Sequence, residues 1–139
     1  MSFSNYLENA ILTHLFGGSP TLTPLTNVYV ALSAADPGET GGTVDEPTIG
    51  VNAYARINIA VADLTIAANN VSNTNAESFP ESTGAWGGSP APSFTHFALY
   101  DASTGGNFLG SAALTTPRTV DGTGITLTFA IGELDITLD

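Results

Sequence analysis

The stretch that decides the fold of this chain is Phe94-Thr95-His96-Phe97-Ala98-Leu99-Tyr100, followed by Asp101-Ala102-Ser103-Thr104-Gly105-Gly106-Asn107. The first seven residues are rich in aromatic and apolar side chains, which predicts a β-strand. The next seven are typical of a turn, because Gly, Asn and Asp accept positive φ angles. We expect a returning strand over residues 108–114, paired with the first.

Other short runs predict further strands of the same kind. Residues 27–33 are almost continuously apolar, as in an internal strand, and alternating or short apolar runs follow at residues 54–59, 64–67, 125–129 and 134–138. Roughly seven or eight strands predict an all-β fold, an antiparallel jelly-roll-like β-sandwich with one N-terminal α-helix. Residues 1–139 would form a single domain, with the sandwich over residues 24–139 and a long loop excursion at residues 68–92.

The N-terminal segment, residues 1–18, predicts the helix. Apolar residues recur along it at helical spacing, Ser4 or Asn5 can cap its start, and the Gly17-Gly18 pair can end it. The apolar surface is wider than one stripe, which indicates burial on two sides. The helix therefore either closes the open end of the sandwich or docks onto another subunit, and we expect docking.

The charge of the chain limits its partners. The 139 residues include thirteen acids, two arginines (Arg56 and Arg118) and no lysine, for a formal net charge of −11. Binding to nucleic acid requires Lys and Arg to neutralise phosphates, so no nucleic-acid partner is expected, and anionic membranes are disfavoured for the same reason. The chain has no cysteine, which excludes disulfides and thiolate metal sites. We recognise no secretory leader and no membrane-spanning run.

No group of residues predicts catalysis. The chain has two histidines and no G-x-S-x-G motif of the kind that presents a serine nucleophile. The acidic loop Asp36–Glu46 could offer oxygens to calcium, but its spacing matches no calcium-binding loop, so neither a metal nor another cofactor is expected. The single tryptophan, Trp86, is expected to anchor a Gly- and Pro-rich segment, and ligand stacking is the alternative. We therefore expect that the protein is not an enzyme.

Five segments carry a resemblance to known proteins: Asn5 to Gly18, Val28 to Ser33 with Asp36-Pro37-Gly38, Tyr54-Ala55-Arg56, Thr95 to Ala102 with Thr104-Gly105-Gly106-Asn107, and Leu134-Asp135-Ile136-Thr137-Leu138. In this order they resemble a family of small tailed-bacteriophage virion proteins. Such proteins are tail-fibre-like, and some are capsid cement or decoration proteins. The resemblance implies a structural virion component and brings no catalytic residues.

On this basis we expect a capsid cement protein that binds the outside of the shell and bridges subunits of the major capsid protein. It would be made in the host cytoplasm and lie on the outer capsid surface of the virion, as a homotrimer suited to three-fold positions. The residues expected to contact partners are Tyr6, Ile11 and Leu15 of the helix, Asp36, Glu39, Asp45 and Glu46 of the acidic loop, and Trp86. The alternatives are a tail-fibre or tail/neck-associated protein and, more remotely, a carbohydrate-binding module.

Overall fold

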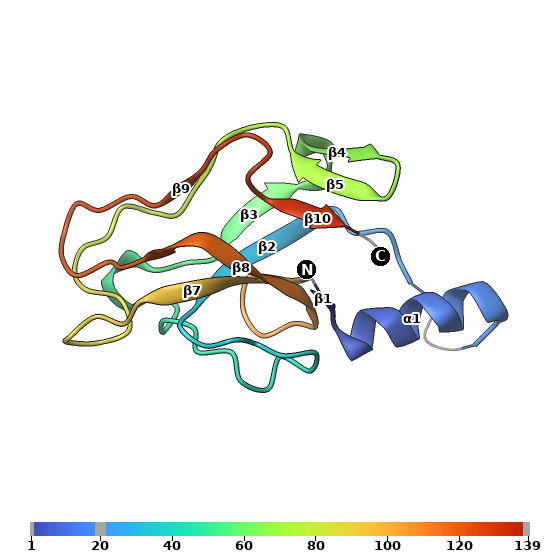
Figure 1. Ribbon diagram of the computed structural model, residues 1–139, viewed down its shortest axis with the longest axis horizontal. Coiled ribbons are helices and arrows are strands. Elements are labelled where there is room, and N and C mark those ends of the chain that lie inside the picture. The colour runs from blue at the N-terminus through green and yellow to red at the C-terminus, as the bar shows by residue number, and fades with distance from the viewer. Residues whose placement is uncertain (1, 19–21, 138–139) are drawn as a thin grey trace.

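The largest sheet of the protein has five strands in the order β1-β8-β7-β2-β3, and all neighbours are antiparallel. A computed structural model of the chain describes residues 2–18 and 22–137 (Figure 1). The strands of this sheet are β1 (Ser2–Phe3), β2 (Asn27–Ser33), β3 (Ile57–Ala60), β7 (Phe94–Tyr100) and β8 (Phe108–Arg118). A second sheet, in the order β10-β5-β4, contains β4 (Leu64–Ala67), β5 (Asn70–Asn73) and β10 (Asp135–Thr137). A third pairs β6 (Glu77–Ser78) with β9 (Thr128–Phe129).

The helix α1 (Asn5–Phe16) projects from one end of these sheets (Figure 1). Ser4 caps its start, and Gly17 ends it with φ of 79°, a left-handed conformation that glycine adopts without a steric penalty. Two single 3-10 turns, η1 (Val51–Ala53) and η2 (Val61–Asp63), flank β3. Within the described residues, no helix combines the length and hydropathy needed to cross a membrane.

The central strands β2 and β7 are buried because both faces of the large sheet are covered. Alternate residues of the two strands enter different clusters: Val30, Leu32, Phe97 and Leu99 lie in the main core, and Ala31, Ala98 and Tyr100 in a second cluster on the opposite face. Val44, from the loop that follows β2, packs against the second cluster. A strand covered on both faces carries apolar residues at successive positions, which explains the almost continuous apolar run of residues 27–33.

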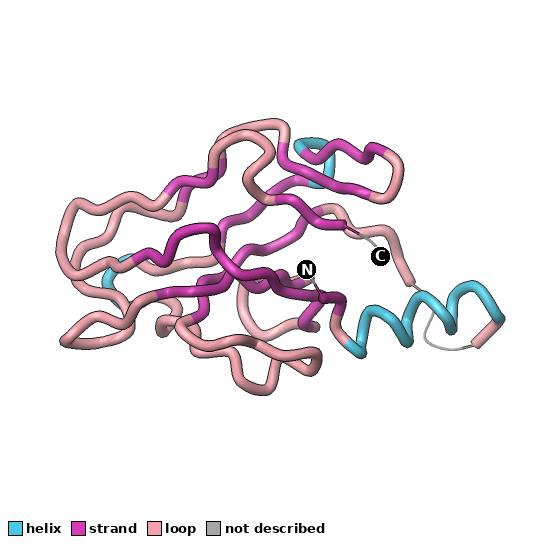
Figure 2. The backbone as a smooth tube through the Cα atoms, viewed as in Figure 1, coloured by secondary structure: helices cyan, strands magenta, loops and turns pink. Residues whose placement is uncertain are grey.

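The excursion at residues 68–92 contains β5 and β6, and beyond β6 it stays paired with the segment that leads into β9. The Phe79 N–H donates to the Leu127 carbonyl at 2.9 Å, and the Trp86 N–H donates to the Val120 carbonyl at 2.9 Å. Opposing residues run from Glu77 with Phe129 to Thr83 with Thr123, so the two segments form one antiparallel ribbon, and its register is irregular at Ser82, whose N–H donates to the Ile125 carbonyl. Pro80 has no N–H to donate, which interrupts a regular ladder, and Figure 2 accordingly draws most of this ribbon as loop.

An aromatic cluster joins this ribbon to the large sheet. The Trp86 ring lies 5.0 Å from Tyr54 and 5.8 Å from Phe79, measured between ring centroids, and Phe129 lies 6.1 Å from Phe97 of β7. These separations are typical of favourable aromatic pairs. The ribbon therefore covers the core face of the large sheet although it contains little regular strand.

The predicted all-β architecture with one N-terminal helix is confirmed, and the predicted strands 27–33 and 94–100 coincide with β2 and β7. The jelly-roll topology is not confirmed, because the strands form sheets of five, three and two. Residues 64–67 join a different sheet and do not continue β3, since η2 turns the chain between them. Only two residues of the predicted strand 125–129 have strand geometry, and residue 138 of the predicted strand 134–138 lies outside the described residues.

Candidate interaction surfaces

The acidic loop between β2 and η1 does not present its four acids as one patch. Asp36, Glu39 and Asp45 are exposed, whereas Glu46 is half-buried. The Asp36 carboxylate accepts a hydrogen bond from the Gly38 N–H at 2.9 Å, so it shapes its own turn. Three of the four acidic residues are therefore exposed to solvent, and the fourth, Glu46, is turned toward the interior.

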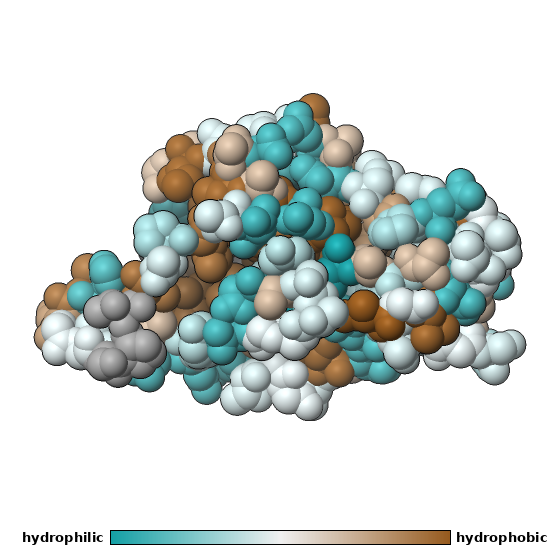
Figure 3. Space-filling model, turned by 180° about the vertical axis from the view of Figure 1, so that it is seen from behind, coloured by the Kyte–Doolittle hydropathy of each residue, from teal (hydrophilic) through white to brown (hydrophobic). Residues whose placement is uncertain are grey.

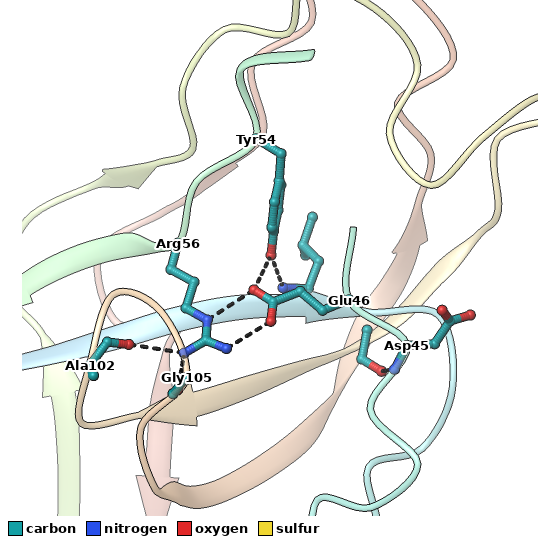
Figure 4. Close-up of polar contacts among 8 residues, drawn as sticks. Asp45, Glu46, Tyr54, Arg56, Ala102 and Gly105 are labelled. Carbon is teal, nitrogen blue, oxygen red and sulfur yellow. Dashed lines mark hydrogen bonds and ion pairs between the residues drawn. The ribbon is translucent and has the colours of Figure 1, made fainter. Parts of the chain in front are cut away.

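The interior carboxylate, Glu46, forms a two-pronged ion pair with Arg56 (Figure 4). The Arg56 Nε atom donates to Glu46 Oε1 at 2.9 Å, and Nη2 donates to Oε2 at 2.8 Å. The Nη1 atom donates to the carbonyls of Ala102 and Gly105, each at 2.9 Å, and the guanidinium carbon lies 3.6 Å from the centroid of the Tyr100 ring. Arg56 thus joins the acidic loop to the turn between β7 and β8.

The Tyr54 hydroxyl completes this cluster. It donates to Glu46 Oε1 at 3.0 Å and accepts a hydrogen bond from the Leu32 N–H at 3.1 Å. Burial, and then the negative charge of Glu46, raise the pKa of Tyr54 well above its usual value, so the phenol stays protonated. Phenol, carboxylate and guanidinium are hydrogen-bonded to one another, so the cluster links the acidic loop to β2 and to the turn between β7 and β8.

A cavity of about 610 Å³ lies between the acidic loop and the segment around Trp86. Its lining includes Asp45, Thr48, Asn52 and Ser89, so the fold brings together two regions that the sequence presents as separate candidates. No group of three or more His, Cys, Asp or Glu side chains that could hold a metal occurs among residues 2–18 and 22–137. The cavity wall therefore combines polar and apolar side chains. Of its two carboxylates, Glu46 is paired with Arg56, whereas Asp45 is exposed.

Trp86 borders this cavity, but its side chain is buried in the core. Its side chain is only 1% exposed, and its Nε1–H donates to the Asn52 carbonyl at 2.9 Å. Stacking on a ligand requires an accessible ring face, and reaching this one would require the aromatic cluster to open. The buried ring and its hydrogen bond therefore suit an anchor for the Gly- and Pro-rich segment around Trp86.

The helix α1 is fixed to the body at its N-terminal end. The Ser4 hydroxyl accepts a hydrogen bond from the Leu7 N–H at 3.1 Å and donates to the Phe108 carbonyl of β8. The Asn5 N–H donates to the Glu39 carbonyl at 2.9 Å, which ties the acidic loop to the first turn of the helix. These bonds to the body all lie at the first turn, and the second half of the helix contacts the body through side chains such as Ile11.

That packing is sparse. Ala10 is the only residue of α1 described as fully buried, whereas Tyr6, Leu15 and Phe16 are 41%, 68% and 82% exposed. Ile11 is half-buried beside β1 and the three-stranded sheet. Within the single chain, the helix is therefore covered on one side, and the second covering predicted from its wide apolar surface would have to come from another molecule.

Sequence reasoning missed part of this surface. Ile66 of β4 and Ile136 of β10 line a groove beside Ile11, and Phe16 is the most exposed large apolar side chain of the helix. Alternation and helical spacing tell which residues share a face. They do not tell which face the rest of the chain leaves open, so no signal in the sequence identifies these residues as exposed.

Comparison with known proteins agrees with the resemblance of the five segments. None of the curated proteins compared with this chain matches it. One family model, described as Podophage GP4 fiber I protein gp80, matches residues 2–137 and therefore nearly the whole chain. The expected relationship to tailed-phage virion proteins of the tail-fibre-like kind is confirmed. The protein belongs to the family of the podophage GP4 fiber I protein gp80.

Proposed function

We propose that this protein is a non-catalytic structural component of the fibre apparatus of a tailed bacteriophage. The observation that carries this proposal is the family match over residues 2–137, because the description of that family names a fibre protein. Membership of the family makes the chain a structural virion protein. Its place in the fibre is the further step that we propose.

The fibre role takes precedence over the capsid cement role expected from the resemblance. The family description agrees with the tail-fibre alternative and gives no specific support to a cement protein. The two roles differ in place and number. A cement protein would bridge the major capsid protein over the whole outer capsid surface, whereas a fibre component would lie at the tail in few copies.

The physical features of the chain suit a structural protein that acts by binding its neighbours through its surface. The ionised groups in its interior are paired with one another, as in the cluster of Glu46 and Arg56. Its exposed candidates are apolar on the helix, at Tyr6 and Leu15, and acidic on the loop, at Asp36, Glu39 and Asp45. We propose that the partners are other copies of the chain and neighbouring virion proteins, and that the chain binds neither nucleic acid nor membrane, because it has almost no cationic groups.

Labelling of purified virions tests the place of the protein. We expect gold-labelled antibodies against this chain to mark the tail, and quantitative mass spectrometry to find few copies relative to the major capsid protein. Antibodies against the major capsid protein serve as the matched control for labelling of the shell. Labelling of the whole shell with hundreds of copies would replace the fibre role by a cement role, and absence from washed particles would overturn both.

A further inference from the structure

An apolar groove runs between the helix α1 and the three-stranded sheet. Phe3 and Ile11 line one side of it, and Ile66, Val71 and Ile136 line the other, around a volume of about 220 Å³. None of the described residues that line it is charged. In the rear view of Figure 3, apolar side chains gather on the body next to the projecting helix. Ile66 is 75% exposed, so this apolar wall is open to solvent.

The same chain carries an apolar projection beside this groove. Leu12, Leu15 and Phe16 lie at positions i, i+3 and i+4, which places them together on the last two turns of α1. They are 56%, 68% and 82% exposed. The hydrogen bonds that hold the helix to the body lie at its first turn, and beyond Ile11, which contacts the groove, these three side chains project into solvent.

The distribution of charge indicates what can cover these surfaces. Two copies of a chain with a net charge of −11 repel each other, so contact between them is least opposed where acids are absent. Residues 12–16 contain no acid, and neither does the described lining of the groove. A basic partner, in contrast, would be attracted to the exposed acids of the loop, such as Asp45, and would gain nothing from this uncharged region.

We propose that the groove receives the C-terminal half of helix α1 from a second copy of this chain, with Leu12, Leu15 and Phe16 of one copy packed against Ile66, Val71 and Ile136 of the next. The contact is heterologous when each copy places its helix in the groove of the next copy, head to tail. Such contacts close into rings when the rotation between copies allows it. The inference rests on the proposed function, which names other copies of the chain as partners, and it specifies the surface through which they join.

The oligomeric state of the purified full chain tests this contact. We expect wild-type protein to form an oligomer by light scattering coupled to size exclusion. Phe16→Glu and Ile66→Glu each place a charge in the contact and should weaken it by roughly thirtyfold or more. Both side chains are largely exposed within the chain, so the fold should survive, as circular dichroism would verify. The matched control is Ile131→Glu, at a residue that is 69% exposed and lies outside the groove lining; it should stay oligomeric.

Mixing the two variants separates this contact from other modes of association. The Phe16→Glu protein keeps an intact groove and the Ile66→Glu protein keeps an intact helix, so a mixture should form a one-to-one heterodimer that neither variant forms alone. A wild-type monomer at high concentration would overturn the inference, and so would oligomeric variants or a mixture that stays monomeric. Each of these results would leave the proposed place in the virion untouched, because labelling of particles tests that place separately.

Discussion

Removing Arg56 from its buried ion pair is expected to destabilise the protein by about 3–5 kcal/mol. The side chains of Arg56 and Glu46 are 5% and 14% exposed, and their closest charged atoms lie 2.8 Å apart. In Arg56→Met, the Glu46 carboxylate keeps the Tyr54 hydroxyl as its hydrogen-bond donor but loses the guanidinium that neutralises it. The cost is large because a half-buried charge without a counter-charge has lost hydration that nothing replaces.

A double-mutant cycle isolates the pair from the other contacts of Arg56. Glu46→Gln removes the negative charge and keeps a similar shape. In the double variant Glu46→Gln/Arg56→Met no unpaired charge remains, so its cost should fall short of the sum of the single costs by about 2–3 kcal/mol. The lost bonds to the carbonyls of Ala102 and Gly105 occur in both variants that lack Arg56, so they cancel from the cycle.

The chain supplies a matched control in Arg118, its other arginine. Arg118 Nη2 lies 3.6 Å from Glu133 Oε1, and the two side chains are 42% and 33% exposed. Solvent screens such a pair, so Arg118→Met should cost less than about 1 kcal/mol. The assay is urea unfolding at one protein concentration, followed by the fluorescence of Trp86, which is the single tryptophan and lies in the core. Single costs that add to within about 0.5 kcal/mol, or an Arg118→Met as damaging as Arg56→Met, would refute the reasoning.

Three other changes probe separate features of the fold. Because burial raises the pKa of Tyr54, the folded protein keeps this proton above about pH 10 while the unfolded chain loses it, and stability falls with rising pH by up to about 1.4 kcal/mol per pH unit. Tyr54→Phe should reduce this alkaline slope in urea unfolding, and an unchanged slope would contradict the assignment. Ser4→Ala removes the helix cap and leaves the Phe108 carbonyl without its donor, so unfolding should cost about 1–2 kcal/mol less; no measurable loss would mean that the helix is held by other contacts. Gly41 has φ of 68°, and a Cβ there would lie 2.7 Å from the Phe108 ring. Gly41→Ala should therefore lower the melting temperature clearly more than Gly50→Ala, which adds backbone strain (φ of 85°) without a clash. Equal decreases in melting temperature would show that the loop can move away from Phe108.

The regular elements were predictable where one local signal decides them. Residues 27–33 and 94–100 have their predicted bounds, because β-forming side chains and flanking turn residues agree there. The N-terminal helix was equally clear from its caps. The ribbon over residues 77–86 was not, because its partner lies more than thirty residues away and its own Pro and Gly residues are typical of loop. Pairing at that distance is a property of the whole fold.

The candidate site also combines features that the local sequence indicates with features that only the whole fold decides. The sequence marks Asp36, Glu39, Asp45 and Glu46 as four similar acids, and only the fold turns Glu46 inward to Arg56. The distinction depends on Arg56 and on the turn at Ala102 and Gly105, residues far apart along the chain.

The sequence by itself determined the β-rich class, the capped N-terminal helix, the strong negative charge and the relationship to tailed-phage virion proteins. These properties follow from local side-chain chemistry and from the order of short segments along the chain. Only the tertiary structure decided which apolar residues stay open to solvent, because exposure depends on what the remaining chain covers. Leu15, Phe16 and Ile66 have the same chemistry as buried Leu32, Phe97 and Ile57, and their exposure, on the helix and in the lining of an uncharged groove, makes them candidates for contact between copies.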